Sequence, residues 1–249
     1  MAENLILLGL VATLGTGLAT GVGALPVLFL RRVSDRLLDT MLGFAAGVML
    51  AATAFSLLVP AVELGGIWVA LAGLAAGAGF VLVLDERIPH LHFIGGAEGP
   101  RSSLRRVWLL ILAITLHNFP EGLAVGVGMG SGDVAAGTVI AIAIGLQNMP
   151  EGLAVALPLL RENYSRGRAL LYAALSGLAE PIAGVLGVAA VALMKPLLPV
   201  GLAFAAGAML YVVSDEMIPE THRRGFQREG TLGVLVGFAV MMFLDNLFG

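Results

Sequence analysis

Long apolar segments are the feature that most constrains how this chain can fold. Eight of them lie at about residues 4–30, 38–62, 66–84, 107–129, 135–160, 168–193, 197–219 and 231–248. An α-helix of about 20 apolar residues crosses the hydrocarbon core of a bilayer. Because only helices and closed barrels satisfy their backbone polar groups in lipid, the segments predict an all-α integral membrane protein. We expect eight transmembrane helices in a single transmembrane domain, residues 1–249.

Composition supports a membrane location and excludes some kinds of site. Hydrophobic residues make up 58% of the chain and charged residues 12%, against about 25% charged residues in soluble domains. The chain has no cysteine, which excludes disulfides and thiolate metal sites. No Lys or Arg precedes residue 31, so the first apolar segment is interpreted as a retained helix and not as a cleaved signal.

The basic residues predict the orientation of the helices. Eight spans place alternate loops on the same side, and the loops after the first, third, fifth and seventh spans carry every Lys and Arg except Lys195. Since basic loops remain cytoplasmic, these loops are predicted to face the cytoplasm and both termini the outside. The longest of them, residues 85–106, lacks apolar periodicity and is expected to be mobile.

Two repeated sequences indicate an internal duplication. "FAAGVML" at residues 44–50 recurs as "FAAGAML" at 204–210, and "HNFPEGLAV" at 117–125 recurs as "QNMPEGLAV" at 147–155. The helices that carry each pair run in opposite directions in the predicted topology, which is typical of an inverted repeat. We therefore expect three helices, a central pair and three more helices, with a binding site near the midplane.

The central pair carries polar side chains that share a helix face. On each helix a glutamate follows a His or Gln by four residues and therefore lies on the same face, with an Asn beside it. These residues are His117, Asn118 and Glu121 on the fourth helix and Gln147, Asn148 and Glu151 on the fifth. Pro120 and Pro150 each free a backbone carbonyl, which is tolerated in a membrane only inside the protein. Glu180 adds a third carboxylate from the sixth helix.

Three carboxylates at this depth require neutralisation. A charged residue at the centre of a transmembrane helix costs about 2.5–3.5 kcal/mol, and no Lys or Arg lies at the same depth. The carboxylates must take up protons or bind a cation from solution. Imidazole, carboxylate and the thioether of Met49 suit Zn, Fe, Mn or Ni, whereas Mg or Ca would need no histidine. The alternative, that these groups only bond helix to helix, explains the duplication less well.

The two motifs resemble the signatures of the ZIP family of divalent metal (zinc/iron) transporters, and most closely those of its prokaryotic branch. The eight spans and outside termini also match, so the resemblance covers nearly the whole chain. It implies a two-metal site at the midplane. The transport site would contain Met49, His117, Glu121, Gln147 and Glu151, and the second site would contain Asn118, Glu121, Asn148, Glu151 and Glu180.

The resemblance also implies a polar path on either side of these sites. Ser56 and Asp245, near the outer ends of the second and eighth helices, would form the access path. The release path at the inner ends of the third and seventh helices would use Asp85, His90, His92, Asp215 and Glu216. Solvated helix ends are the alternative explanation for these charges.

Two residues depart from the family pattern. The motif in the fifth helix often begins with His, and here it begins with Gln147. Some members have a carboxylate where this chain has Asn148. Since an amide is neutral, this change bears on metal preference and on occupancy of the second site.

Together these features predict an uptake transporter of a bacterial inner membrane. It would carry Zn2+, with Fe2+, Mn2+ and Cd2+ as alternatives, into the cytoplasm by alternating access. Its partners would be the transported metal and the bilayer, with no nucleic acid and no other cofactor, and a homodimer stays open. A membrane-embedded metallohydrolase is one alternative, but the chain lacks the H-E-x-x-H pattern. A metal-binding receptor without flux is the other.

Overall fold

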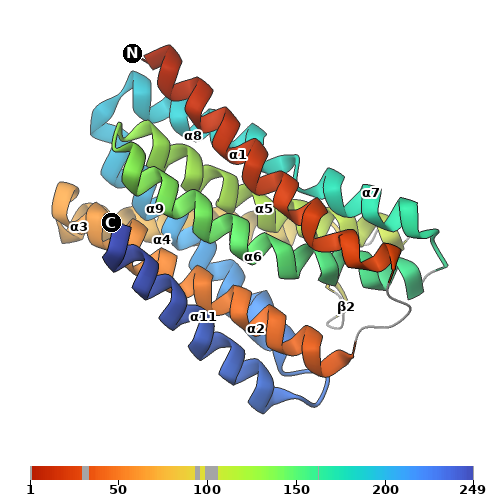
Figure 1. The fold of residues 1–249 in the computed structure, drawn as a ribbon. Coiled ribbons are helices and arrows are strands. Elements are labelled where there is room, and N and C mark those ends of the chain that lie inside the picture. The colour runs from red at the N-terminus through yellow and green to blue at the C-terminus, as the bar shows by residue number, and fades with distance from the viewer. Residues whose placement is uncertain (1, 30–33, 93–95, 99–105, 162, 249) are drawn as a thin grey trace.

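The computed structural model describes all residues except 1, 30–33, 93–95, 99–105, 162 and 249 (Figure 1). The α-helices are α1 (Ala2–Ala24), α2 (Asp35–Ala51), α3 (Val59–Gly65), α4 (Ile67–Arg87), α5 (Arg106–Gly130), α6 (Val134–Arg161), α7 (Arg166–Ser176), α8 (Ala179–Leu193), α9 (Leu198–Val212), α10 (Ile218–Thr221) and α11 (Gln227–Phe248). They are extended by two 3-10 helices, η1 (Leu25–Leu28) and η3 (Lys195–Leu197), and by two π-helices, η2 (Ala52–Leu58) and η4 (Val213–Met217).

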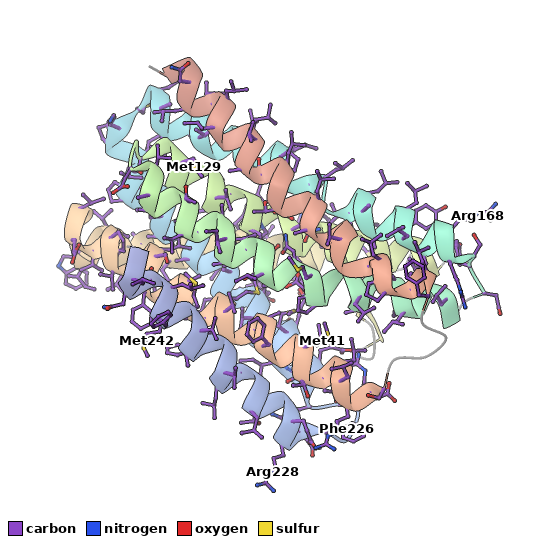
Figure 2. The ribbon with its side chains drawn as sticks, in the orientation of Figure 1. Met41, Met129, Arg168, Phe226, Arg228 and Met242 are labelled. Carbon is purple, nitrogen blue, oxygen red and sulfur yellow. The ribbon has the colours of Figure 1, made fainter. Side chains whose placement is uncertain are left out.

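The predicted all-α integral membrane fold is confirmed. Within the described residues, 7 helical spans are long and apolar enough to cross a membrane. Helix α5, with 25 residues, lies among them as a further long helix (Figure 1). Helix α1 begins and α11 ends at the same end of the bundle, while Arg168 and Arg228 lie toward the opposite end (Figure 2). The termini and these basic residues are therefore separated as the charge pattern predicts.

Two local features differ from the prediction. The predicted sixth helix is broken between α7 and α8, because Pro181 in the first turn of α8 cannot bond to the carbonyl of Gly177. Inside the predicted loop 85–106, strands β1 (His90–His92) and β2 (Gly96–Glu98) pair antiparallel. The expected mobility of this loop remains a prediction.

The helices form two groups that contact each other along the bundle. Helices α1, α5, α6, α7 and α8 make one group, in which α1 packs mainly on α6 and α5 mainly on α8. Helices α2, α4, α9 and α11 make the other, in which α2 packs on α11 and α4 on α9 (Figure 1). The polar central helices α5 and α6 therefore lie in one group and contact the other through α9 and α2.

The closest helix contacts repeat in the two halves of the chain. A Cβ atom at Gly77 would meet the backbone oxygen of Phe204, and one at Gly237 would meet the backbone oxygen of Phe44. Phe44 and Phe204 begin the two FAAG sequences, so these are equivalent contacts. The π-helices η2 and η4 also follow the two FAAG sequences at equivalent positions. The matched contacts are those that a 3+2+3 inverted repeat requires.

Candidate metal site

The side chains predicted to bind metal are buried where α5, α6 and α8 meet. Asn118, Glu121, Gln147, Asn148 and Glu180 are all 0% exposed, and Glu151 is 8% exposed. Met49, from α2 in the other group, is also buried. Pro120 and Pro150 lie inside continuous helices, so α5 and α6 carry their polar faces through the bundle without a break.

Hydrogen bonds connect these side chains across five helices. The Gln147 amide donates to Glu121 Oε1 at 2.6 Å, which joins α6 to α5. The Asn148 amide donates to Glu180 Oε1 at 2.7 Å and to the carbonyl of Thr16 at 2.9 Å. The Asn118 amide donates to the carbonyl of Ser176 at 2.8 Å. Each amide NH2 group is thus held by the protein.

Other oxygens of the same groups have no such partners. Within this set of side chains, six buried oxygen atoms lack a hydrogen-bond partner among the described residues, namely Asn118 Oδ1, Glu121 Oε2, Gln147 Oε1, Asn148 Oδ1, Glu151 Oε1 and Glu180 Oε2. Buried polar atoms are nearly always satisfied in folded proteins. Every one of these atoms is a hydrogen-bond acceptor. A bound cation or a hydrogen-bond donor would therefore satisfy them.

The charges in this region have the same sign. Glu121, Glu151 and Glu180 are electrostatic neighbours of one another, and His117 lies near Glu151. A buried charge without a partner destabilises a protein by about 3–5 kcal/mol. The arrangement therefore favours a bound divalent cation or protonated carboxyl groups.

The described residues do not bring three His, Asp or Glu side chains to one point. A metal bound here would therefore also need amide or thioether donors, of the kind that Gln147, Asn118, Asn148 and Met49 offer. Amide oxygens are suitable ligands for divalent ions.

The structure brings the proposed access residues together. The Ser56 hydroxyl, on η2, donates a hydrogen bond of 2.5 Å to Asp245 Oδ1 on α11. These residues are 189 positions apart in the chain, so the contact depends on the packing of α2 and η2 against α11.

The proposed release residues are connected to the central site. His117 Nε2 lies 2.7 Å from Glu216 Oε2, on η4. The Tyr211 hydroxyl donates to Asp85 Oδ2 at 3.3 Å, which joins α9 to the end of α4. Asp215 is exposed beside Glu216. His90 and His92 lie on β1, and their side chains lie outside the described part of the chain.

A family model described as ZIP Zinc transporter matches residues 94–245. Zinc transporter GufA of Myxococcus xanthus is 45% identical over 97% of this chain and 99% of its own length. The chain belongs to the ZIP family. Zinc transporter ZIPB of Bordetella bronchiseptica is 45% identical over 93% of this chain and 78% of its own length. Zinc transporter ZIP11 of Homo sapiens is 38% identical over 95% of this chain and 96% of its own length. Membership of the ZIP family identifies a transporter and not an enzyme, which removes the metallohydrolase alternative.

Sequence reasoning missed several polar residues of this ZIP protein. Arg224 Nη1 donates to Asp39 Oδ1 at 2.6 Å, and its Nη2 donates to Glu220 Oε1. Asp39 is 0% exposed, although a carboxylate near the end of a predicted span suggests a solvated group. Tyr211 and Thr20 were also missed, because a single hydroxyl in an apolar segment gives no periodic signal.

Proposed function

We propose that this protein carries Zn2+ across the membrane into the cytoplasm through two sites at the midplane. The observation that carries the proposal is the set of six buried oxygen atoms without partners between α5, α6 and α8. The names of the ZIP relatives support Zn2+ as the substrate. Fe2+, Mn2+ and Cd2+ remain candidate substrates, because imidazole and carboxylate ligands suit them as well.

The transport site would use both central helices and α2. His117 would supply an imidazole nitrogen and Met49 a thioether, with Glu121 and Glu151 as charged ligands and Gln147 as a neutral one. The hydrogen bond from Gln147 occupies Glu121 Oε1, whereas Glu121 Oε2 has no hydrogen-bond partner among the described residues and would bind the metal. A metal that replaces protons on these ligands releases them, so binding should weaken as the pH falls.

The second site would share the two glutamates. Asn118, Asn148 and Glu180 would complete it, and Glu121 and Glu151 would bridge the two ions. Because Asn148 also bonds to Glu180 and to α1, it would orient this carboxylate even where it did not bind metal itself.

The paths give the proposal a direction. Metal would enter past Ser56 and Asp245 and leave past Glu216, Asp215 and Asp85, with His90 and His92 further along. Glu216 lies against His117, so it would be the first group to receive the ion. The two helix groups suit alternating access, in which the group holding α5 and α6 moves against the other. The basic loops would face the cytoplasm of a bacterial inner membrane, with both termini outside.

Zn2+ flux into liposomes that contain the purified protein tests the function. Glu121→Ala should abolish saturable flux, and Glu121→Gln, which keeps the side-chain volume, should do nearly the same. Glu63→Ala is the matched control, since Glu63 is exposed on α3, and it should transport like the parent protein. Undiminished flux in both Glu121 variants would overturn the proposal. Binding of Zn2+ without flux in the parent protein would instead favour a receptor.

A further inference from the structure

Thr20 on α1 occupies the position that corresponds to Glu180 on α8. A Cβ atom at Gly122, in the motif of α5, would meet the backbone oxygen of Glu180. A Cβ atom at Gly152, the equivalent glycine of α6, would meet the backbone oxygen of Thr20. Each of these residues therefore lies directly against one of the two PEG sequences.

The hydrogen bonds of the two asparagines show the same correspondence. Asn148 donates to the carbonyl of Thr16 on α1, and Asn118 donates to the carbonyl of Ser176 at the end of α7. Thr16 precedes Thr20 by four residues, as Ser176 precedes Glu180. The two halves thus place Thr20 and Glu180 at equivalent positions, each against one of the two central helices.

The Thr20 hydroxyl has the same unusual feature as the proposed ligands. Thr20 is 0% exposed, and its Oγ1 has no hydrogen-bond partner among the described residues. A threonine in a helix commonly donates to a carbonyl one turn earlier. Thr13, on the same helix, does this with the carbonyl of Gly9 at 2.7 Å, whereas Thr20 does not. Its hydroxyl is therefore a buried oxygen that remains available to a ligand.

We propose that the Thr20 hydroxyl binds the ion in the second site, opposite Glu180. This inference rests on the proposed function. Threonine and serine hydroxyls bind divalent cations in phosphate-binding loops, and a hydroxyl can donate a lone pair without adding charge. The second site would then have only oxygen ligands, with a carboxylate on the α8 side and a neutral hydroxyl on the α1 side.

An all-oxygen set has a chemical consequence. Imidazole and thioether ligands in the transport site favour Zn2+ and softer ions, whereas oxygen ligands suit harder ions such as Mn2+. The second site would therefore accept Mn2+ more readily than the transport site does. Thr20 would contribute to this preference, because it adds an oxygen where the equivalent half offers a carboxylate.

Calorimetric titration of the purified protein with Zn2+ tests the role of Thr20. The parent protein should bind two ions. Thr20→Val, which has nearly the same shape, should weaken the second binding event about 10-fold, as is typical for a metal-site residue, and leave the first unchanged. Thr20→Ser, which keeps the hydroxyl, should retain the second binding event. Thr13→Val is the control, because that hydroxyl is buried but already bonded, and it should bind like the parent protein.

Three outcomes would count against the inference. Two unchanged binding events in Thr20→Val would overturn it, as would a single binding event in the parent protein. A Thr20→Ser variant that behaves like Thr20→Val would show that packing, and not the hydroxyl, is responsible. The flux measurement on the Glu121 variants tests the proposed function separately. If the Glu121 variants lose flux while Thr20→Val still binds two ions normally, the proposed function stands and only the role of Thr20 is refuted.

Discussion

The two halves of the bundle share their backbone contacts but differ in the side chains that meet at its centre. Gly122 lies against α8 as Gly152 lies against α1, and both asparagines donate to carbonyls at equivalent positions. The side chains are less alike. The half that contains α5, α8 and η4 supplies His117, Glu180 and Glu216. The half that contains α6, α1 and η2 supplies Gln147, Thr20 and Ser56 at the equivalent positions.

This difference separates the requirements of shape from those of chemistry. Close backbone contacts need small residues, so a duplicated scaffold keeps its glycines in both halves. A transported ion instead needs a path whose two ends differ. At the positions that differ, the half that faces the proposed release path carries ionisable groups and the other half carries neutral ones, while both keep a central glutamate, Glu121 or Glu151. We infer that the repeated backbone permits two equivalent conformations and that the side chains distinguish inside from outside.

The largest expected effect comes from the shared backbone contacts. At Gly152 a Cβ atom alone would come within 1.8 Å of the backbone oxygen of Thr20, so Gly152→Leu would force α1 and α6 apart. We expect the variant to lose folded, monodisperse protein, and Gly122→Leu to do the same. Size-exclusion chromatography in detergent and the thermal midpoint measure this. Gly15→Leu is the control, because nothing lies within 4 Å of a Cβ there. A tolerated change in only one half would contradict the equivalence.

The next effect concerns an ionic contact that the repeat does not duplicate. Arg224 bonds to Asp39 and Glu220, whereas the equivalent positions in the other half are Pro199 and Pro60. Removing one partner of a buried ion pair typically costs about 3–5 kcal/mol. Arg224→Met should therefore lower the free energy of unfolding by about 3 kcal/mol.

Denaturant titration of the purified protein measures this loss. Arg168→Met is the control, since Arg168 is exposed on α7, and it should unfold like the parent protein. Asp39→Asn combined with Arg224→Met should recover part of the stability, because Asp39, one of the two carboxylates that lose Arg224, is then neutral. An unchanged stability in Arg224→Met would show that the ion pair contributes nothing in the folded protein.

A smaller effect should follow from exchanging His117 and Gln147. His117→Gln removes the imidazole, and we expect the Zn2+ affinity of the transport site to fall about 10-fold or more, as metal-site changes commonly do. Gln147→His should keep or raise the affinity. Because imidazole takes up a proton near pH 6.5, Gln147→His should also make binding fall more steeply as the pH drops from about 7.5 to 5.5, and His117→Gln less steeply.

Titration of each variant with Zn2+ across this pH range checks the exchange. Gln147 lies on the helix opposite His117, so the two variants differ mainly in the side of the site that carries the imidazole. If Zn2+ affinity fell equally in His117→Gln and Gln147→His, an imidazole on α6 could not replace the one on α5.

Local pattern was sufficient to predict most of the fold. Apolar length predicts the spans, and the four-residue spacing predicts that His117 and Glu121 share a face. The contacts that depend on helix pairing were not predictable. Tyr211 meets Asp85 and Arg224 meets Asp39 only because helices distant in the chain pack together. Thr20 gives no signal in its own helix, and its role becomes visible only when α1 is compared with α8.

The smallest expected effect lies at the proposed access path, where a neutral hydroxyl occupies the position of an ionisable side chain in the other half. Ser56 donates to Asp245, and the equivalent position in the other half holds Glu216. A hydrogen bond to a charged group contributes about 1.5–3 kcal/mol, but this contact is only partly buried. Ser56→Ala should therefore lower uptake at limiting Zn2+ by about 3-fold, mainly through KM, since Asp245 stays in place but is less well oriented. Glu216→Gln should reduce the maximal rate instead, because it weakens release from His117. Flux measured over a range of Zn2+ concentrations separates these two effects. If Ser56→Ala lowered the maximal rate and Glu216→Gln raised KM, the proposed direction of transport would have to be reversed.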